Sequence, residues 1–165
     1  IRTIAPMFNT YRMVLEYGDR FYIPNCRRRH RLFQNERKAV YELAAWKQKV
    51  RTFWPQVQIL DVANGNAENL YFGDTLEVTA KIHLGNLSEK DVKVEIYHGA
   101  LKPEGALEAA AKERMVWVKA LDGDVHLFKG RARCDRTGAL GISVRVLPSH
   151  PDLIHEHETG LITWA

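Results

Sequence analysis

The spacing of apolar residues changes at Pro55, and this change constrains the fold more than any other feature of the sequence. Before Pro55, apolar residues recur at helical spacing, about every 3.6 positions. After it, they alternate with polar residues, which is the period of a β-strand with one buried face. The sequence therefore predicts two units, a helical segment at 1–55 and a β domain at 56–165.

Two helices are predicted in the first unit. The first begins at a cap formed by Asn9 or Thr10 and ends at Pro24, because the residue before a proline disfavours helical backbone angles. The second begins at a cap formed by Asn35 and ends at Pro55. Its apolar side is broad and is made of Val40, Leu43, Ala44, Trp46, Val50, Phe53 and Trp54.

The second unit is predicted to hold about seven strands, separated by turns rich in Gly, Asp, Pro and Asn. Many short strands joined by tight turns favour an antiparallel β-sandwich of the immunoglobulin-like type. The fold class is therefore mainly β: an immunoglobulin-like antiparallel β-sandwich preceded by two α-helices. The expected strands lie within 56–62, 76–84, 92–97, 116–118, 125–133, 142–147 and 161–164.

Charge is distributed unevenly along the chain. Residues 1–60 hold twelve basic and four acidic residues, whereas residues 61–165 hold twelve and sixteen, so the net charge of +4 comes from the first part. A basic run within the first part makes a candidate anion contact, because clustered guanidinium groups raise the local positive potential. The alternative is a solvated loop past Pro24, and no nucleic-acid motif accompanies the run. Its members are Arg27, Arg28, Arg29 and Arg31, with His30 between them.

Composition excludes several classes of protein. No stretch approaches the roughly 20 consecutive apolar residues of a membrane span, so no membrane partner is expected. Cys26 and Cys134 lie far apart and have no CxxC partner, which fits a reducing cytoplasm better than a disulfide framework. Because the chain starts at Ile1 inside an apolar run, we expect it to be part of a longer protein.

Catalytic signatures are missing from the sequence, which has no GxSxG, P-loop, GxGxxG or HExxH motif. Imidazole and carboxylate side chains do gather near the C-terminus, where they could hold a divalent metal. His155 and His157 would share one strand face, but no third ligand is fixed, so we expect an exposed polar loop and no metal. The full group is His150, Asp152, His155, Glu156, His157 and Glu158.

Several segments resemble a known family. The run PMFNTYRMVLEY at 6–17 and the run FYIP at 21–24 resemble the C-terminal end of bacterial and archaeal α-glucan phosphorylases, which are enzymes of glycosyltransferase family 35. Stretches within 78–97 and 138–151 resemble the terminal extension of the same family. So does the closing run GLITWA at 160–165. The resemblance spans nearly the whole chain.

The resemblance implies phosphorolysis of a terminal α-1,4 linkage by a parent enzyme, with glucose 1-phosphate as product and pyridoxal phosphate bound to a lysine. In the family that lysine lies in a Gly-rich segment upstream of the helix around Arg12, and no lysine here matches that context. The chain alone is thus expected to lack catalytic and cofactor-binding residues and to be inactive. It would pack on the remainder of the phosphorylase chain or on a second copy.

The alternative hypothesis is a carbohydrate-binding module that holds glucan near the catalytic domain. Tyr97, Trp117 and Trp164 are the candidate glucan contacts, since aromatic faces bind sugar rings. Such a platform needs two of these side chains exposed side by side. Burial in a core or in a domain interface is the alternative, and it is the one that we expect.

Overall fold

The computed structural model describes residues 9–65, 70–135 and 137–165. The chain divides between Trp46 and Lys47 into two compact units.

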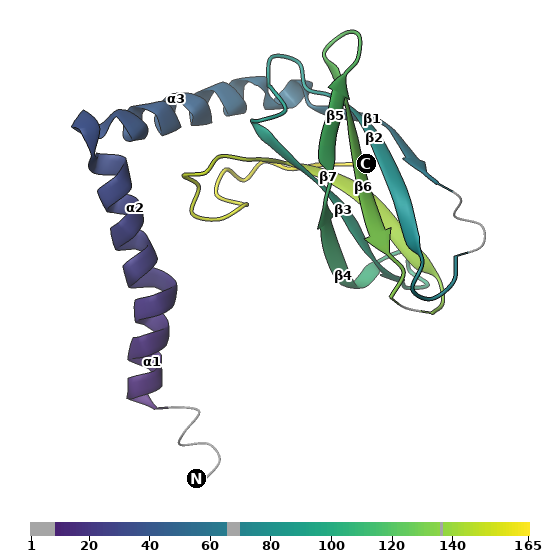
Figure 1. Ribbon diagram of the computed structural model, residues 1–165, viewed down its shortest axis with the longest axis horizontal. Coiled ribbons are helices and arrows are strands. Elements are labelled where there is room, and N and C mark those ends of the chain that lie inside the picture. The colour runs from purple at the N-terminus through teal and green to yellow at the C-terminus, as the bar shows by residue number, and fades with distance from the viewer. Residues whose placement is uncertain (1–8, 66–69, 136) are drawn as a thin grey trace. The chain divides into compact units, whose positions relative to one another are not determined.

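The first unit contains one long helical run. Helix α1 (Thr10–Tyr17), the π-helical turn η1 (Gly18–Tyr22) and helix α2 (Ile23–Phe33) follow one another without a break (Figure 1). Asn9 caps the start, as predicted, by accepting a 2.7 Å hydrogen bond from the Arg12 backbone amide at its Oδ1.

The prediction that Pro24 ends the first helix is wrong. Proline cannot donate the usual helical hydrogen bond, and its ring clashes with the preceding turn. The chain widens that turn instead. The Ile23 amide donates to the Gly18 carbonyl, a spacing of five residues that defines the π-helix. The helix therefore continues through Pro24 to Phe33.

The second predicted helix is present as α3 (Lys38–Phe53), flanked by the 3-10 turns η2 (Asn35–Arg37) and η3 (Trp54–Gln56). It starts three residues after Asn35, because Asn35, Glu36 and Arg37 all have positive φ angles of 48°, 55° and 64°. This left-handed turn separates α2 from α3.

The second unit is a β-sandwich of two antiparallel four-stranded sheets (Figure 1). One sheet has the order β1-β2-β6-β5 and the other the order β4-β3-β7-β8. The predicted sandwich is thus confirmed. The strands are β1 (Gln58–Asn64), β2 (Thr75–His83), β3 (Val92–Leu101), β4 (Leu107–Arg114), β5 (Val116–Ala120), β6 (Val125–Arg133), β7 (Leu140–Pro148) and β8 (Thr163–Trp164).

Strand β4 is the one that sequence analysis missed. Its sequence, LEAAAKER, consists of residues that favour helices in isolation. Pairing with β3 along the sheet overrides this local preference.

The core lies between the sheets and is built from alternate residues of the strands. Ile82 on β2, Ile96 on β3 and Val144 on β7 have no exposed surface. Met115 lies between β4 and β5, where the chain crosses from one sheet to the other, and its amide donates to the Val94 carbonyl at 2.9 Å. Gly130 on β6 lies directly against Ile96 and Met115.

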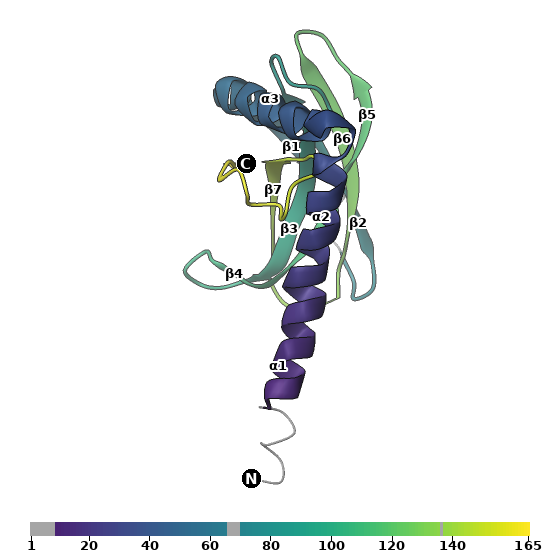
Figure 2. The same ribbon diagram turned by 90° about the vertical axis from the view of Figure 1, so that its left-hand side faces the viewer.

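After β7 the chain forms an irregular segment, residues 149–162, which we call the C-terminal strap. Figures 1 and 2 show it leaving the end of β7 and returning to the short strand β8. The strap brings the predicted histidine and carboxylate cluster next to the outer face of the sheet that contains β3 and β7.

Candidate functional site

The three candidate glucan-contact residues do not form one platform. Tyr97 lies on β3 and Trp164 on β8, in one sheet, whereas Trp117 lies on β5 in the other sheet. Trp117 is 41 % exposed and its Nε1 donates a 3.1 Å hydrogen bond to Nδ1 of His126. Trp164 is 45 % exposed, so neither tryptophan is buried in the core of the sandwich. Burial in a domain interface stays a prediction.

Tyr97 and Trp164 do lie side by side, with ring centroids 5.3 Å apart and an interplanar angle of 81°. The guanidinium carbon of Arg145 lies 5.4 Å from the Tyr97 ring centroid and 5.5 Å from that of Trp164. The two rings meet edge to face and do not present a flat surface.

Arg145 is also half of a buried ion pair. Its guanidinium is 2.7 Å from the carboxylate of Glu95, and the two side chains are only 6 % and 8 % exposed. Because Glu95 and Arg145 are directly paired across β3 and β7, the sheet itself holds them together. Glu95 has a second cationic partner, because the Lys93 ammonium lies 2.8 Å from its carboxylate.

Glu156 fastens the C-terminal strap to this group. Its carboxylate contacts Lys93, lies 2.8 Å from Lys112 on β4 and lies 3.4 Å from Arg145. The strap is held a second time by Glu158, which contacts Lys47 on α3. Three cations thus share two carboxylates, Glu95 and Glu156, and this ion cluster fixes the strap on the sheet.

The cluster sets the ionisation of its members. Hydrogen bonds from Lys112 and Lys93 lower the pKa of Glu156 to about 2. Burial raises the pKa of Glu95, but hydrogen bonds from Lys93 and Arg145 outweigh burial and hold that pKa below its ordinary value. Burial lowers the pKa of Lys93, but Glu156 and Glu95 together keep it above the ordinary value. All of these groups are therefore charged at neutral pH.

The low pKa of Glu156 gives a pH prediction. A depressed pKa in the folded state adds stability that is present above the unfolded pKa of about 4.5 and is lost as pH falls toward 2. Glu156→Gln is expected to lower the free energy of unfolding by about 1.5 kcal/mol at pH 7, and by less at each step below pH 4.5. Urea unfolding at pH 7, 5 and 3 measures this. If Glu156→Gln lowered the free energy of unfolding equally at all three pH values, the lowered pKa of Glu156 in the folded state would be contradicted.

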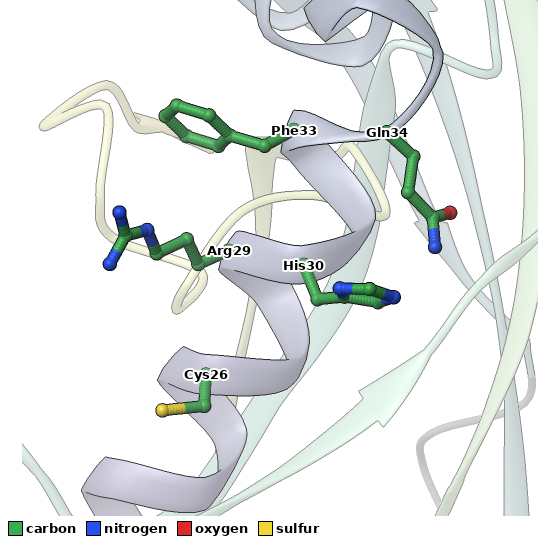
Figure 3. Close-up of a pocket in the computed structure, with 5 residues that line it drawn as sticks. All are labelled: Cys26, Arg29, His30, Phe33 and Gln34. Atoms are coloured by element: carbon green, nitrogen blue, oxygen red, sulfur yellow. The ribbon is translucent and has the colours of Figure 1, made fainter.

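The basic run lies on a helix and not in a loop. Arg27, Arg28, Arg29 and Arg31 belong to α2, because the helix continues past Pro24, so the solvated-loop interpretation is wrong. Figure 3 shows Arg29 and Phe33 on one side of α2. The Arg29 guanidinium lies 5.7 Å from the Phe33 ring centroid. A shallow pocket of about 360 Å³ here is lined by Cys26, Arg29, His30, Phe33 and Gln34.

The histidine cluster lies in a polar loop, as predicted. His155 and His157 are exposed and lie in turns of the strap, not on a strand face. Glu156 and Glu158 are only partly exposed, because both are engaged in ion pairs. Among the described residues, no three His, Cys, Asp or Glu side chains lie together so that they could hold a metal ion.

The ion cluster is not predicted from the sequence. Lys93, Glu95 and Arg145 are simply polar residues that alternate with apolar ones within two of the expected strands. A weak signal was available, since opposite charges occupy outward positions on two predicted neighbouring strands. Glu156 belongs to the predicted histidine and carboxylate group, but nothing in the sequence pointed to its pairing with Lys93, which lies 63 residues away.

A large group of exposed apolar side chains belongs to the helical unit. Between residues 9 and 46, Leu32 and Leu43 are the buried large apolar side chains. Ten others are exposed, which a soluble protein ordinarily avoids unless another surface covers them. They are Tyr11, Met13, Val14, Leu15, Tyr17, Phe21, Tyr22, Ile23, Phe33 and Tyr41. We call the part on α1 and η1 the apolar helix surface. No described helix is long and apolar enough to cross a membrane.

Comparison with known proteins places these features in a family. The sequence model of a family described as the glycogen phosphorylase C-terminal domain matches residues 54–165. A maltodextrin phosphorylase from Thermococcus litoralis is 35 % identical over 99 % of this chain, and a glycogen phosphorylase from Mycobacterium tuberculosis is 30 % identical over all of it. The chain covers 19 % of the length of each relative.

Proposed function

The chain belongs to the glycogen phosphorylase C-terminal domain family, and we propose that it forms the non-catalytic C-terminal part of an α-glucan phosphorylase. In this proposal the parent enzyme is cytoplasmic and transfers the terminal α-1,4-linked glucose of glycogen or maltodextrin to inorganic phosphate, giving glucose 1-phosphate. The similarity of the chain to two phosphorylases along its whole length supports the proposal.

The parent's cofactor, pyridoxal phosphate, would require a lysine that can form an imine. No lysine of this sequence lies in the Gly-rich context that the resemblance implies for the cofactor-binding lysine. Lys93 is the least exposed lysine of the ion cluster, but it is paired with Glu95 and Glu156, and its raised pKa keeps it protonated. A protonated amine is not a nucleophile. We therefore assign cofactor and chemistry to the remainder of the parent chain.

The contribution of this chain is packing. The apolar helix surface carries this part of the proposal, because Val14, Phe21 and Tyr22 are 60 %, 54 % and 67 % exposed on a unit with little core of its own. Burying a large apolar side chain contributes about 1.5–3 kcal/mol, so several of them supply a strong docking surface. We propose that this surface docks on the remainder of the phosphorylase.

Complementation in trans tests the proposal. A parent enzyme truncated before the position of Ile1 is expected to be impaired and to regain phosphorolysis when the 165-residue chain is added. Phe21→Asp is expected to weaken this rescue by about tenfold or more, because it places a charge in the apolar contact. Release of glucose 1-phosphate from maltodextrin, with pyridoxal phosphate added, is the measurement.

Two controls make the result decisive. The 165-residue chain without the parent is expected to release no glucose 1-phosphate, and release above background would defeat the non-catalytic assignment. Leu60→Asp changes an exposed apolar residue on β1, outside the helical unit, and is expected to rescue like the unmodified chain. Equal rescue by Phe21→Asp and Leu60→Asp would contradict docking through the helices.

A glucan-binding module is the second candidate. The observation in its favour is the half-exposed Trp164 beside Tyr97. Against it stand the edge-to-face angle of the two rings and the remote position of Trp117. Calorimetric titration of the chain with maltoheptaose separates this candidate from a pure packing role.

A further inference from the structure

Three cations of the sandwich converge on the carboxylate of Glu156. It contacts Lys93 on β3, lies 2.8 Å from Lys112 on β4 and lies 3.4 Å from Arg145 on β7. These strands are neighbours in one sheet, so the sheet holds the three cations together, and we call them the cation site. His157 Nε2 also lies 3.2 Å from this carboxylate, but it belongs to the strap. The pKa of Glu156, lowered to about 2 mainly by the two lysines, shows that the cation site favours a negatively charged oxygen ligand.

Without the strap, the cation site has an excess of positive charge. Within the described parts of the chain, Glu95 is the other carboxylate that pairs with its members, through Lys93 and Arg145. If Glu156 leaves, three positive charges therefore face one negative charge. An excess of this kind is costly in a partly buried position and favours the binding of an anion.

The cation site is also both preformed and open to small ligands. Arg145 is 6 % exposed on its side chain, and its guanidinium lies 5.4 Å and 5.5 Å from the ring centroids of Tyr97 and Trp164. This packing prevents Arg145 from turning away when its ligand changes. On the open side, the Lys112 and Glu156 side chains are 46 % and 26 % exposed, so a small ligand can reach the position of the Glu156 carboxylate.

The strap that carries Glu156 has no buried anchor. Every residue from 149 to 162 is exposed or half-buried, and Figure 1 shows this segment extending away from the strands. Ion pairs hold it instead, through Glu156 in the cation site and Glu158 at Lys47. A ligand tethered by a short segment competes at an effective concentration on the order of millimolar. An external anion of equal or greater charge therefore competes with Glu156 at millimolar concentration.

We propose that the cation site binds a phosphate group, and that Glu156 of the strap occupies this site until such a ligand displaces it. A phosphate group has three strong acceptor oxygens and, near neutral pH, almost two negative charges, so it matches the excess charge of the open site. Arginine and lysine side chains are the usual partners of phosphate. The ligand is either free phosphate or a small phosphate ester. This proposal does not depend on the docking of the helical unit.

Removal of the internal ligand tests the site. Glu156→Gln is expected to bind phosphate about tenfold or more tightly than the original chain, because the external ligand no longer competes with a carboxylate. Adding Lys112→Met is expected to abolish this gain. Calorimetric titrations with inorganic phosphate and with glucose 1-phosphate measure binding, and comparison of the two ligands distinguishes free phosphate from a phosphate ester.

Glu77→Gln is the matched control. Glu77 also lies between two cations, 2.9 Å from Lys129 and 3.2 Å from Arg131, but all three side chains are at least 46 % exposed. This variant is expected to bind phosphate no more tightly than the original chain. Phosphate bound by the basic run of α2 contributes equally to both variants. If neither ligand bound Glu156→Gln more tightly than Glu77→Gln, the proposal would be overturned.

The original chain provides a test without a substitution. Millimolar phosphate is expected to speed amide hydrogen exchange in residues 149–162 about twofold or more, relative to sodium chloride of equal ionic strength, because it displaces the strap. Exchange in β2 is expected to be the same in both salts, since this strand lies in the other sheet. Equal exchange of the strap in phosphate and in chloride would show that Glu156 is not displaced, and the proposal would fail.

Discussion

Replacing Arg145 by methionine is expected to lower the free energy of unfolding of the sandwich by about 3–5 kcal/mol. Arg145 is 6 % exposed on its side chain and is the partner of the equally buried Glu95 at 2.7 Å. Methionine keeps much of the apolar stem but removes the charge, so Glu95 retains only Lys93 and Glu156 loses one of its three cations. Denaturant unfolding followed by tryptophan emission measures the loss.

The expected loss of unfolding free energy comes from leaving the buried charge of Glu95 with too few partners. A double-mutant cycle tests this cause. Glu95→Gln added to Arg145→Met is expected to cost less than the sum of the single changes by about 1–3 kcal/mol. Arg131→Met is the matched control, because Arg131 contacts Glu77 at 3.2 Å on the surface with side chains 70 % and 46 % exposed. That exposed pair is expected to contribute at most about 1 kcal/mol. Equal losses for Arg145→Met and Arg131→Met would contradict this view of the cluster.

The parts of the fold that could be predicted from the sequence are those determined by the pattern of neighbouring residues. Strand β2 alternates buried and exposed residues from Leu76 to His83, and a one-residue shift would turn its apolar face to solvent. The turn at Asp122–Asp124 is likewise determined by nearby residues, with positive φ angles at Gly123 and Asp124. Patterns of this kind are readable without knowing the tertiary structure.

The features that were not predicted from the sequence depend on contacts between distant residues or on adjustments of the backbone. Strand β4 has a helical composition and is a strand because β3 lies beside it. Pro24 would end an ideal α-helix, but a single π-helical turn accommodates it. The ion cluster joins Lys93, Arg145 and Glu156 from separate parts of the chain, and no local spacing connects them.

Shortening Ile96 to alanine is expected to destabilise the sandwich by about 2–5 kcal/mol, because the side chain is fully buried and the surrounding strands cannot close the cavity. The position also has an unusual neighbour. A Cβ atom added at Gly130 would lie 2.9 Å from Ile96 Cδ1 and 2.9 Å from Met115 Cγ. Gly130→Ala alone is therefore expected to overpack the core and cost about 1–3 kcal/mol.

The two changes are expected to compensate. Ile96→Ala removes the Cδ1 atom that the new methyl group at position 130 would meet, and only the flexible Met115 side chain then has to move. The double variant is expected to cost less than the sum of the single variants by about 1 kcal/mol or more. Ile82→Ala combined with Gly130→Ala is the control, because Ile82 is equally buried but is not among the atoms nearest to the Gly130 position. In both double variants the loss of unfolding free energy can be compared with the sum of the losses in the single variants. If both losses equalled those sums, the close approach of β6 to Ile96 and Met115 would not be the reason for glycine at position 130.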